Sequence, residues 1–183
     1  MDPAVPRPHR LPEKIGRYRI LSRLGKGAMG IVYCAHDDDM GRNVAVKVMT
    51  ADAEGDDTAR ERFLREARVT GRLLHRNIVT VFNAGEDDGR HFIVMELLEG
   101  VTLKEWLKSP HTLEEKLDLM IQTCDGLSVA HAAGVIHRDV KPNNLFVLPD
   151  GNLKILDFGV ARLVASNVTR SGLIIGTPGY MSP

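Results

Sequence analysis

Short apolar runs separated by turn residues fill the first half of the chain. Three of them, YRILSRLG, GIVYCAHD and NVAVKVM, lie between residues 18 and 49, and two more, IVTVFNAG and HFIVMEL, lie between residues 78 and 97. The runs are rich in β-branched and aromatic residues, and Asp88-Gly89 between the last two is typical of a hairpin turn. The pattern predicts five antiparallel strands in one sheet.

Residues 58–74 change to a helical period. Ala59, Phe63, Glu66, Thr70 and Leu73 recur at spacings of four, three, four and three, which places them on one face of a helix. The sheet is therefore expected to carry one helix, and Glu66 is expected on the inward face of that helix.

After Gly100 the pattern is mainly helical. Residues 103–108 predict a short helix, and Thr112 with Glu115 three positions later forms a capping box that begins a long one. Gly134 offers the C-terminal stop of this long helix. The apolar positions that keep helical spacing along it are Leu113, Leu117, Met120, Cys124 and Leu127.

The octet HRDVKPNN, residues 137–144, follows the long helix directly. Its proline and paired asparagines predict a loop, and the runs LFVL and NLKIL around Asp150-Gly151 predict a small hairpin behind it. A carboxylate, two cations and two amides are thus held between a helix and a hairpin.

Composition indicates an ordinary soluble globular protein of 183 residues, 43% hydrophobic and 26% charged. The 24 basic and 24 acidic side chains balance, so no global field favours nucleic acid or a membrane surface. Cys34 and Cys124 have neither metal-ligand nor disulfide spacing, which indicates reduced, packed thiols and a cytoplasmic location. The opening MDPAVPRPHRLPEK predicts a flexible proline-rich tail, and no apolar segment is long enough to span a bilayer.

The segment LGKGAMGIV, residues 24–32, has glycines at 25, 27 and 30. Glycines let backbone N–H groups approach phosphate oxygens, although a hairpin without a ligand or a dinucleotide-binding turn would share the spacing. A dinucleotide turn leads into a helix, whereas Gly30 leads into the β-branched run IVY. A glycine-rich flap between two strands is therefore the better interpretation.

Lys47 lies in a predicted strand, where a lysine often simply points to solvent. A carboxylate on the apolar face of the next helix is costly to bury unless a cation meets it, and Lys47 is the nearest candidate for Glu66. The pair would fix the ammonium group where it can reach phosphates.

Five motifs occur in the order and spacing of the eukaryotic-type protein kinases: the glycine-rich segment, Lys47, Glu66, HRDVKPNN, and DFG at 157–159. The chain resembles this family from Tyr18 to Pro183. Lys141, two positions after Asp139, resembles the serine/threonine branch. The segments GKGAMGIVY and GTPGYMSP are most similar to bacterial members. Residues 1–17 would be the tail that the resemblance leaves out.

The resemblance implies an α+β, two-lobe kinase fold. Residues 18–98 would form the small, ATP-binding lobe, with a five-stranded antiparallel sheet and one helix. Residues 99–183 would form a mainly helical large lobe. This lobe would be incomplete, because the catalytic domain would be truncated after the activation segment. The stripe of the long helix would then lack partners and form an exposed apolar patch.

The resemblance also assigns roles in transferring a phosphoryl group from ATP to a protein serine or threonine. Asp139 would accept or orient the proton of the substrate hydroxyl, and Lys141 would neutralise charge on the transferring group. Asn144 and Asp157 would hold the metal ions, Mg²⁺ or Mn²⁺. A lone aspartate in a loop is more often a turn former, but its companions disfavour that interpretation.

By the same resemblance, ATP would be bound by the glycine-rich flap, the strand lysine with its glutamate, and the segment that joins the lobes. Met95 would be the gatekeeper, and the backbone of Glu96 and Leu98 would bond the base edge. His137 and Phe158 would pack behind the site instead of taking part in the chemistry. The full ATP-binding set is Leu24, Gly25, Lys26, Gly27, Gly30, Val32, Ala45, Lys47, Glu66, Met95, Glu96, Leu98 and Phe146.

Residues 161–180 resemble an activation segment. Thr169 and Ser171 would be autophosphorylation sites, and Thr177 would pack against the catalytic aspartate and lysine. Arg138 would meet the phosphorylated segment, or would instead cap local loop carbonyls.

Two classes of function stay open at this point. The first is a protein serine/threonine kinase that acts on protein substrates and on itself, with a homodimer through the small lobe as a further prediction. The second is a nucleotide-binding or interaction module that transfers no phosphate, because the family continues beyond MSP. A kinase of small molecules is disfavoured by the HRDVKPNN loop and the long activation segment.

Overall fold

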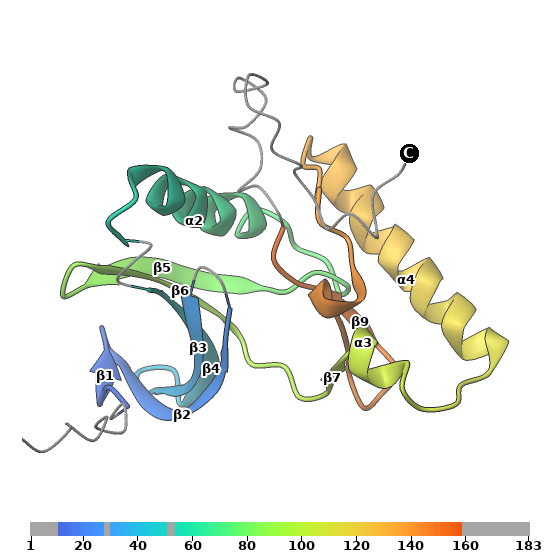
Figure 1. The fold of residues 1–183 in the computed structure, drawn as a ribbon, viewed down its shortest axis with the longest axis horizontal. Helices are drawn as coiled ribbons and strands as arrows, with labels where there is room; N and C mark the ends of the chain where they lie inside the picture. Colours follow the sequence, from blue (N-terminus) through green and yellow to red (C-terminus); the bar gives the residue numbers. More distant parts are fainter. Residues whose placement is uncertain (1–10, 28–29, 51–53, 159–183) are drawn as a thin grey trace, which may run out of the picture.

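Residues 11–27, 30–50 and 54–158 are described by the computed structural model. Within them, six antiparallel strands form one strongly curled sheet in the order β1-β2-β3-β4-β6-β5 (Figure 1). The five predicted strands are all present, and a short sixth strand precedes them. The strands are β1 (Lys14–Ile15), β2 (Tyr18–Lys26), β3 (Gly30–Asp37), β4 (Arg42–Met49), β5 (Val81–Asp87) and β6 (Arg90–Glu96).

The short strand β1 lies where the sequence predicted a flexible tail. Ile15 pairs with Tyr18 and is only 7% exposed. Gly16, with φ of +55°, makes the tight turn between the two strands. The prediction of a tail over residues 1–17 is therefore wrong for 14–15, because one apolar side chain at the sheet edge finds a place in the core. Residues 1–10 lie outside the described residues.

The two faces of the sheet have different roles because side chains alternate along each strand. On one face, Tyr33, Ala35, Val44, Val46 and Val48 are buried in a core with residues of the neighbouring strands. The other face carries the alternate positions of β3, β4 and β6. That face is covered by helix α2 (Asp57–Thr70) (Figure 1).

Helix α2 packs on the sheet through Phe63 and Ala67, which contact Met49 and Ile93. The inward position predicted for Glu66 is confirmed, since this residue is 8% exposed. The helix ends at Thr70, four residues before the predicted end. Leu73 is still buried, but in the loop that leads to the second half of the molecule.

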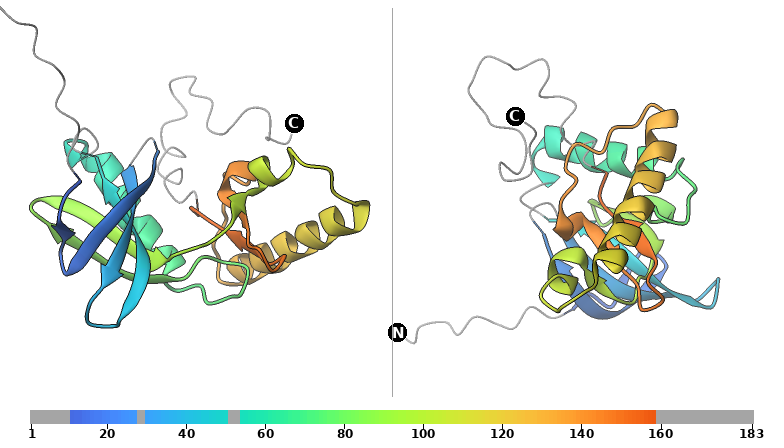
Figure 2. Two further views of the ribbon diagram at one scale, coloured as in Figure 1. Left: turned by 90° about the horizontal axis from the view of Figure 1, so that it is seen from below. Right: turned by 90° about the vertical axis from the view of Figure 1, so that its right-hand side faces the viewer.

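The second half combines helices with a small three-stranded sheet of order β7-β8-β9, where two strands were predicted (Figure 2). The capping box is confirmed, with the Glu115 side chain accepting from the Thr112 N–H at 2.7 Å. Gly134, with φ of +73°, follows the long helix. The elements are β7 (Val101–Thr102), α3 (Leu103–Trp106), α4 (Leu113–Ala132), the 3₁₀ turn η1 (Pro142–Asn144), β8 (Leu145–Val147) and β9 (Leu153–Ile155).

Helix α4 buries a different face from its most apolar one. Leu119, Thr123, Gly126 and Ala130 are its buried residues. A Cβ at Gly126 would lie 2.7 Å from Ile155 Cδ1, so a glycine here lets the helix approach β9 closely. The predicted stripe is largely exposed, at 72%, 52% and 62% for Leu113, Leu117 and Met120, and Cys124 is exposed as well.

Backbone pairing joins the two halves of the molecule. The Val79 N–H donates to the Ile155 carbonyl at 3.0 Å, and the Ile155 N–H donates to the Asn77 carbonyl at 2.8 Å. Ile78 and Leu73 share one buried cluster with Leu145, Leu153, Ile155 and Phe158. Because these contacts fix the end of β9 against the segment after α2, Asp157 is held opposite the sheet.

None of the helices in the described residues is both long and apolar enough to cross a membrane.

Candidate active site

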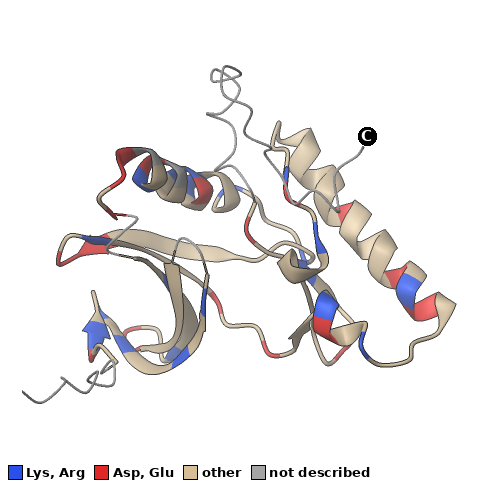
Figure 3. Ribbon diagram, viewed as in Figure 1, with Lys and Arg blue, Asp and Glu red and all other residues tan. Residues whose placement is uncertain are grey.

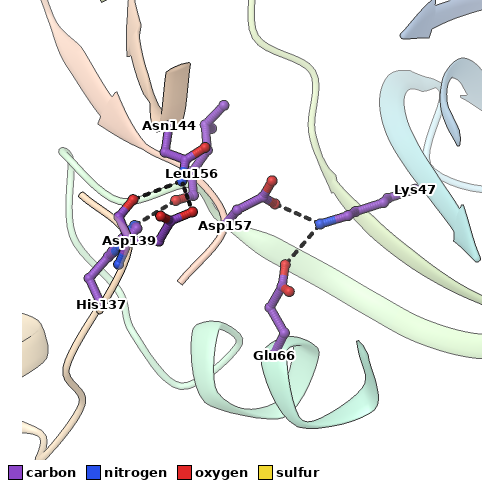
Figure 4. A network of polar contacts seen from close by, with 7 residues as sticks. All are labelled: Lys47, Glu66, His137, Asp139, Asn144, Leu156 and Asp157. Atoms are coloured by element: carbon purple, nitrogen blue, oxygen red, sulfur yellow. Dashed lines mark hydrogen bonds and ion pairs between the residues drawn. The ribbon is translucent and has the colours of Figure 1, made fainter. Parts of the chain in front are cut away.

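Lys47 lies at the centre of a polar cluster between the two halves (Figure 4). Its Nζ is 3.0 Å from Glu66 Oε1 and 2.8 Å from Asp157 Oδ1. The Lys47 and Glu66 side chains are 12% and 11% exposed, whereas that of Asp157 is 50% exposed. The predicted pairing of Lys47 with Glu66 is confirmed, and Asp157 is a second carboxylate on the same ammonium group.

The charges in this cluster shift one another's pKa. Burial raises the pKa of Glu66 to about 7, a rise that Lys47 opposes and Asp157 strengthens. For Lys47, burial favours the neutral amine, but the two carboxylates outweigh it and raise the pKa. For Asp157, desolvation acts upward and the Lys47 charge outweighs it, which lowers the pKa. Near neutral pH the ammonium group and Asp157 are therefore charged, and Glu66 is the group that changes protonation.

This shift predicts a pH dependence of stability. Between pH 4.5, the ordinary pKa of a glutamate, and about pH 7, Glu66 is protonated to a greater extent in the folded chain than in the unfolded chain. Its contribution to the unfolding free energy therefore falls as the pH rises through this range. Relative to Glu66→Gln, the parent should lose about 1–3 kcal/mol between pH 5 and 8. Urea denaturation of both proteins across this range measures the difference. Parallel pH profiles would contradict the prediction.

Asp139, Lys141 and Asn144 lie together in the loop before β8. Lys141 Nζ is 2.8 Å from Asp139 Oδ2. The Asn144 amide nitrogen donates to the Asp139 backbone carbonyl at 2.9 Å and to Oδ2 at 3.3 Å. The Asp139 carboxylate therefore has its orientation fixed from within the loop, and η1 positions the amide that does so.

His137 is buried and bonds both the loop that carries Asp139 and the backbone next to Asp157. It is 1% exposed, its Nε2–H donates to the Leu156 carbonyl at 2.9 Å, and its Nδ1 accepts from the Asp139 N–H at 3.2 Å. Burial lowers the pKa of His137, which keeps the imidazole neutral as these two bonds require. Its ring contacts Phe158, with centroids 4.9 Å apart. The expected packing role of His137 and Phe158 is confirmed.

Two residues of the site have left-handed backbone. Arg138 has a φ of 63° and Asp157 a φ of 42°. Such conformations are uncommon outside glycine and persist where the surrounding structure enforces them, often at functional sites. The Leu156 N–H donates to the Asn144 carbonyl at 2.8 Å, so the strand before Asp157 is tied to the loop that carries Asp139.

The three glycines of the flap differ in what surrounds them. A Cβ on Gly30 would lie 2.6 Å from the Val48 carbonyl oxygen, so the β3–β4 pairing itself requires glycine there. Nothing lies within 4 Å of a Cβ on Gly25, and the nearest atom to a Cβ on Gly27 is at 3.8 Å. The fold therefore explains Gly30, while Gly25 and Gly27 leave space beside the strand ends. Residues 28 and 29 lie outside the described residues.

Gly30→Ala is accordingly expected to lower the unfolding free energy by about 1–3 kcal/mol, because the added methyl group forces the β4 backbone away. Gly25→Ala is the matched control, and we expect it to change stability by less than about 0.5 kcal/mol. Thermal denaturation of the two variants beside the parent tests this. Equal stabilities of both variants would show that the pairing relaxes without cost.

The residues predicted to surround ATP are partly brought together. Val32 lies opposite Lys47, and Ala45 lies opposite Met95, so all four share one face of the sheet. Leu24 lies near the end of β2 and is 53% exposed, and Lys26 is the last residue of that strand. Leu98 lies after β6, and Phe146 lies in β8. In the part of the chain that the structure describes, none of these four residues forms a hydrogen bond or ion pair with the Lys47 cluster.

Glu96 has a partner that sequence reasoning missed. Its Oε1 accepts from Lys154 Nζ at 2.7 Å and from the Thr80 N–H at 2.6 Å. Lys154 lies on β9, so this ion pair links the two halves beside the connecting segment. The only sequence signal was a lysine between apolar residues in NLKIL. The Glu96 N–H donates to the Thr80 carbonyl at 2.9 Å.

Asp157 and Asn144 fit a divalent cation. Asp157 presents a half-exposed carboxylate. Asn144 directs its amide nitrogen to Asp139, and its side-chain oxygen makes no bond to that residue. Over the described ranges there is no cluster of three or more His, Cys, Asp or Glu side chains suited to a metal. Mg²⁺ commonly takes one or two protein ligands and completes its shell with phosphates and water, which suits this pair.

Several predicted residues lie outside the described residues. They include Gly159 of DFG and the activation segment with Thr169, Ser171 and Thr177.

Protein kinases typically have a lysine–glutamate pair between a curled sheet and its helix. Opposite this pair they have a loop that carries the catalytic aspartate and the aspartate of a DFG motif. The chain belongs to this family: residues 18–183 match the family model described as protein kinase domain. It is 43% identical over 176 residues to serine/threonine-protein kinase PknA of Mycobacterium tuberculosis, covering 92% of this chain and 41% of that protein. Serine/threonine-protein kinase PrkC of Bacillus subtilis is 39% identical over 171 residues, covering 92% and 26%.

Solved structures agree with this assignment. The chain is similar to the Mycobacterium tuberculosis PknI kinase domain, with a TM-score of 0.70 and 32% identity over 82% of this chain and 64% of that one. The apo form of PpkA-294, at 24% identity, shows the same fold with a TM-score of 0.79 over 93% of this chain and 69% of that one. The α+β kinase fold is thereby confirmed. The chain spans about a quarter to two fifths of the length of the curated relatives it matches.

Proposed function

We propose that this chain carries the ATP-binding and catalytic-loop parts of a serine/threonine kinase that transfers the γ-phosphate of ATP to hydroxyl groups of proteins, itself included. The observation that carries the proposal is the placement of Lys47 between Glu66 and Asp157, opposite a loop in which Lys141 and Asn144 orient Asp139. In Figure 4 the Asp157 side chain lies between Lys47 and Glu66 on one side and Asp139 and Asn144 on the other.

Phosphoryl transfer places developing negative charge between an attacking and a leaving oxygen. In this proposal Asp139 accepts the hydrogen bond of the attacking hydroxyl and takes its proton, since its carboxylate is fixed by Asn144. Lys141 exchanges its contact with Asp139 for one with the transferring group and offsets its charge. Lys47 contacts the phosphates that remain on the nucleotide, with Glu66 fixing its position.

A divalent cation, Mg²⁺ or Mn²⁺, would be held by Asp157 and Asn144 and would neutralise phosphate charge when bound. Gly25 and Gly27 leave room for phosphates at the flap. Val32, Ala45 and Met95 would contact the base, whose edge would meet the Glu96 carbonyl and the Leu98 backbone. Leu24, Lys26 and Phe146 are proposed as further ATP contacts on the resemblance alone.

The test is intact and peptide mass spectrometry of purified residues 1–183 after incubation with Mg²⁺ and ATP, beside Asp139→Asn. Phosphate on Thr169 or Ser171 in the parent alone would support kinase activity and these phosphosites together. If both proteins bind ATP and neither gains phosphate on itself or on a generic basic protein substrate, this chain is a nucleotide-binding module and the proposal fails.

We further propose a cytoplasmic location, protein substrates in place of nucleic acid, and a small lobe over residues 18–98 that is joined to a partial large lobe over residues 99–183. Free Cys34 and Cys124 support a reducing compartment. The change from sheet to mainly helical structure after β6 supports the lobe boundary. A homodimer through the small lobe is proposed as well, and light scattering during size-exclusion chromatography would measure it.

A further inference from the structure

An open groove runs along helix α4 on the side of the β8–β9 turn. One part is a cavity of about 450 Å³ between α3, α4 and the turn, and the adjoining part is a cavity of about 370 Å³. Asp118 and Gly151 line both, so the two cavities form one continuous groove. None of the residues placed in the candidate active site lines it.

The first cavity is mainly apolar. It is lined by Val101, Trp106, Leu119, Val147, Leu148 and Pro149 among others. Trp106 is the only tryptophan of the chain, and the His111 ring stacks on its indole with centroids 3.3 Å apart and planes 9° apart. His111 also bonds the Trp106 carbonyl at 2.8 Å. The indole is therefore held in place, and such fixed aromatic surfaces are favoured anchors for partner side chains.

The second part of the groove is acidic. Asp118, Asp125 and Asp150 line it, and Glu115 lies at the rim of the apolar cavity. Arg76 is the one basic residue among the lining residues of the two cavities, and it contacts Asn152. Acidic bands along α4 are visible in Figure 3. Hydrogen bonds from Asn152 lower the pKa of Asp150, and those from Thr112 lower the pKa of Glu115, so both stay ionised at neutral pH.

The spacing of the acidic residues sets the length of a matching ligand. Glu115, Asp118 and Asp125 lie three and seven positions apart, on one face of α4. At about 1.5 Å per residue they extend over about 15 Å of the helix axis. An extended peptide of about five residues covers that length. A carboxylate row repels phosphate groups, which disfavours nucleic acid and anionic lipid surfaces as ligands.

We propose that this groove docks an extended basic peptide segment of a protein partner, with an apolar side chain in the Trp106 cavity and an arginine or lysine beside Asp118 and Asp125. Guanidinium and ammonium groups pair with such carboxylates, and the apolar anchor supplies the desolvated contact that exposed ion pairs lack. The groove is a docking surface separate from the candidate active site, and its occupancy requires no phosphoryl transfer.

The test begins with a phage library of random dodecapeptides. The library is depleted on Asp118→Asn/Asp125→Asn and then selected on the parent chain, which removes peptides that bind other apolar surfaces such as the exposed stripe of α4. We expect selected peptides to share an arginine or lysine within about three residues of a leucine, valine, proline or aromatic residue. No enrichment over the depleted background, or an acidic or uncharged consensus, would overturn the proposal.

A labelled consensus peptide is then titrated with the parent by fluorescence anisotropy. Binding should weaken at least about fivefold with Asp118→Asn/Asp125→Asn, and also when the peptide's arginine is changed to glutamine or its apolar residue to alanine. Asp38→Asn/Asp39→Asn, which removes two exposed carboxylates near the β3–β4 turn, is the matched control and should bind as the parent does. Equal losses in both double variants would show a general charge effect and would sink the idea of a specific groove.

Discussion

Asp139→Asn is expected to slow phosphoryl transfer by about 10²–10⁴-fold. Asparagine has the same shape but cannot take the proton of the attacking hydroxyl, and it loses the ion pair with Lys141, whose Nζ lies 2.8 Å from Asp139 Oδ2. Initial rates of phosphate incorporation from labelled ATP into a protein substrate measure the loss. The fold should survive, because the substitution removes one partly exposed ion pair worth about 1 kcal/mol at most.

Two controls separate chemistry from binding in this variant. The dissociation constant of a fluorescent ATP analogue should change little, because the proposed nucleotide contacts of Lys47 and the flap are elsewhere. Arg138→Gln changes a charge next to Asp139 in the same loop. When neither protein is phosphorylated on the activation segment, Arg138→Gln should retain far more activity than Asp139→Asn. An Asp139→Asn variant that retains a tenth or more of the parent rate would refute the assignment of Asp139 as the proton acceptor.

Lys47→Met is expected to lower both activity and stability. The ammonium group is the cation between the Glu66 and Asp157 carboxylates, and its removal leaves Glu66, 8% exposed, without its ion-pair partner. Breaking a buried pair from one side costs on the order of 3 kcal/mol of unfolding free energy. Loss of a positioned charge at the phosphates should reduce kcat/KM for ATP by about 10²–10³-fold.

The double variant Lys47→Met/Glu66→Gln distinguishes these two effects. Glutamine removes the stranded carboxylate, so we expect most of the lost stability to return while the activity stays low. Urea denaturation and phosphate-incorporation rates on the four proteins complete a double-mutant cycle. If Glu66→Gln restored activity along with stability, Lys47 would matter only for the fold, and its proposed phosphate contact would be wrong.

The fold was largely predictable because its signals are local. Short apolar runs rich in β-branched residues, broken by turn residues, predicted the strands of the sheet. Thr112 with Glu115 marked the start of α4 through a cap that involves neighbouring residues alone. The errors occur where distant contacts decide. Ile15 is buried in one cluster with Tyr33 and Phe92, and the buried face of α4 is set by Gly126, which admits Ile155. Neither contact leaves a periodic trace in the sequence.

The candidate site was predictable for a different reason. Protein kinases share the order and spacing of their motifs, and the motifs around Lys47, Asp139 and Asp157 show that order in the sequence itself. The pairing of Glu66 with Lys47 could be argued because a buried carboxylate requires a cation. The Glu96–Lys154 ion pair could not, since each residue taken alone resembles an ordinary partly exposed charge.

By itself, the sequence determined the strands and helices of the two halves, the kinase resemblance and the residue types of the chemistry, because periodicity, capping and motif order are properties of neighbouring positions. The tertiary structure alone decided that Lys47 contacts both Glu66 and Asp157, that Glu96 pairs with Lys154, and that a groove joins an apolar cavity to carboxylates of α4. These features arise where segments far apart in the chain meet, and the distances between their charged atoms exist only once the two halves are packed together.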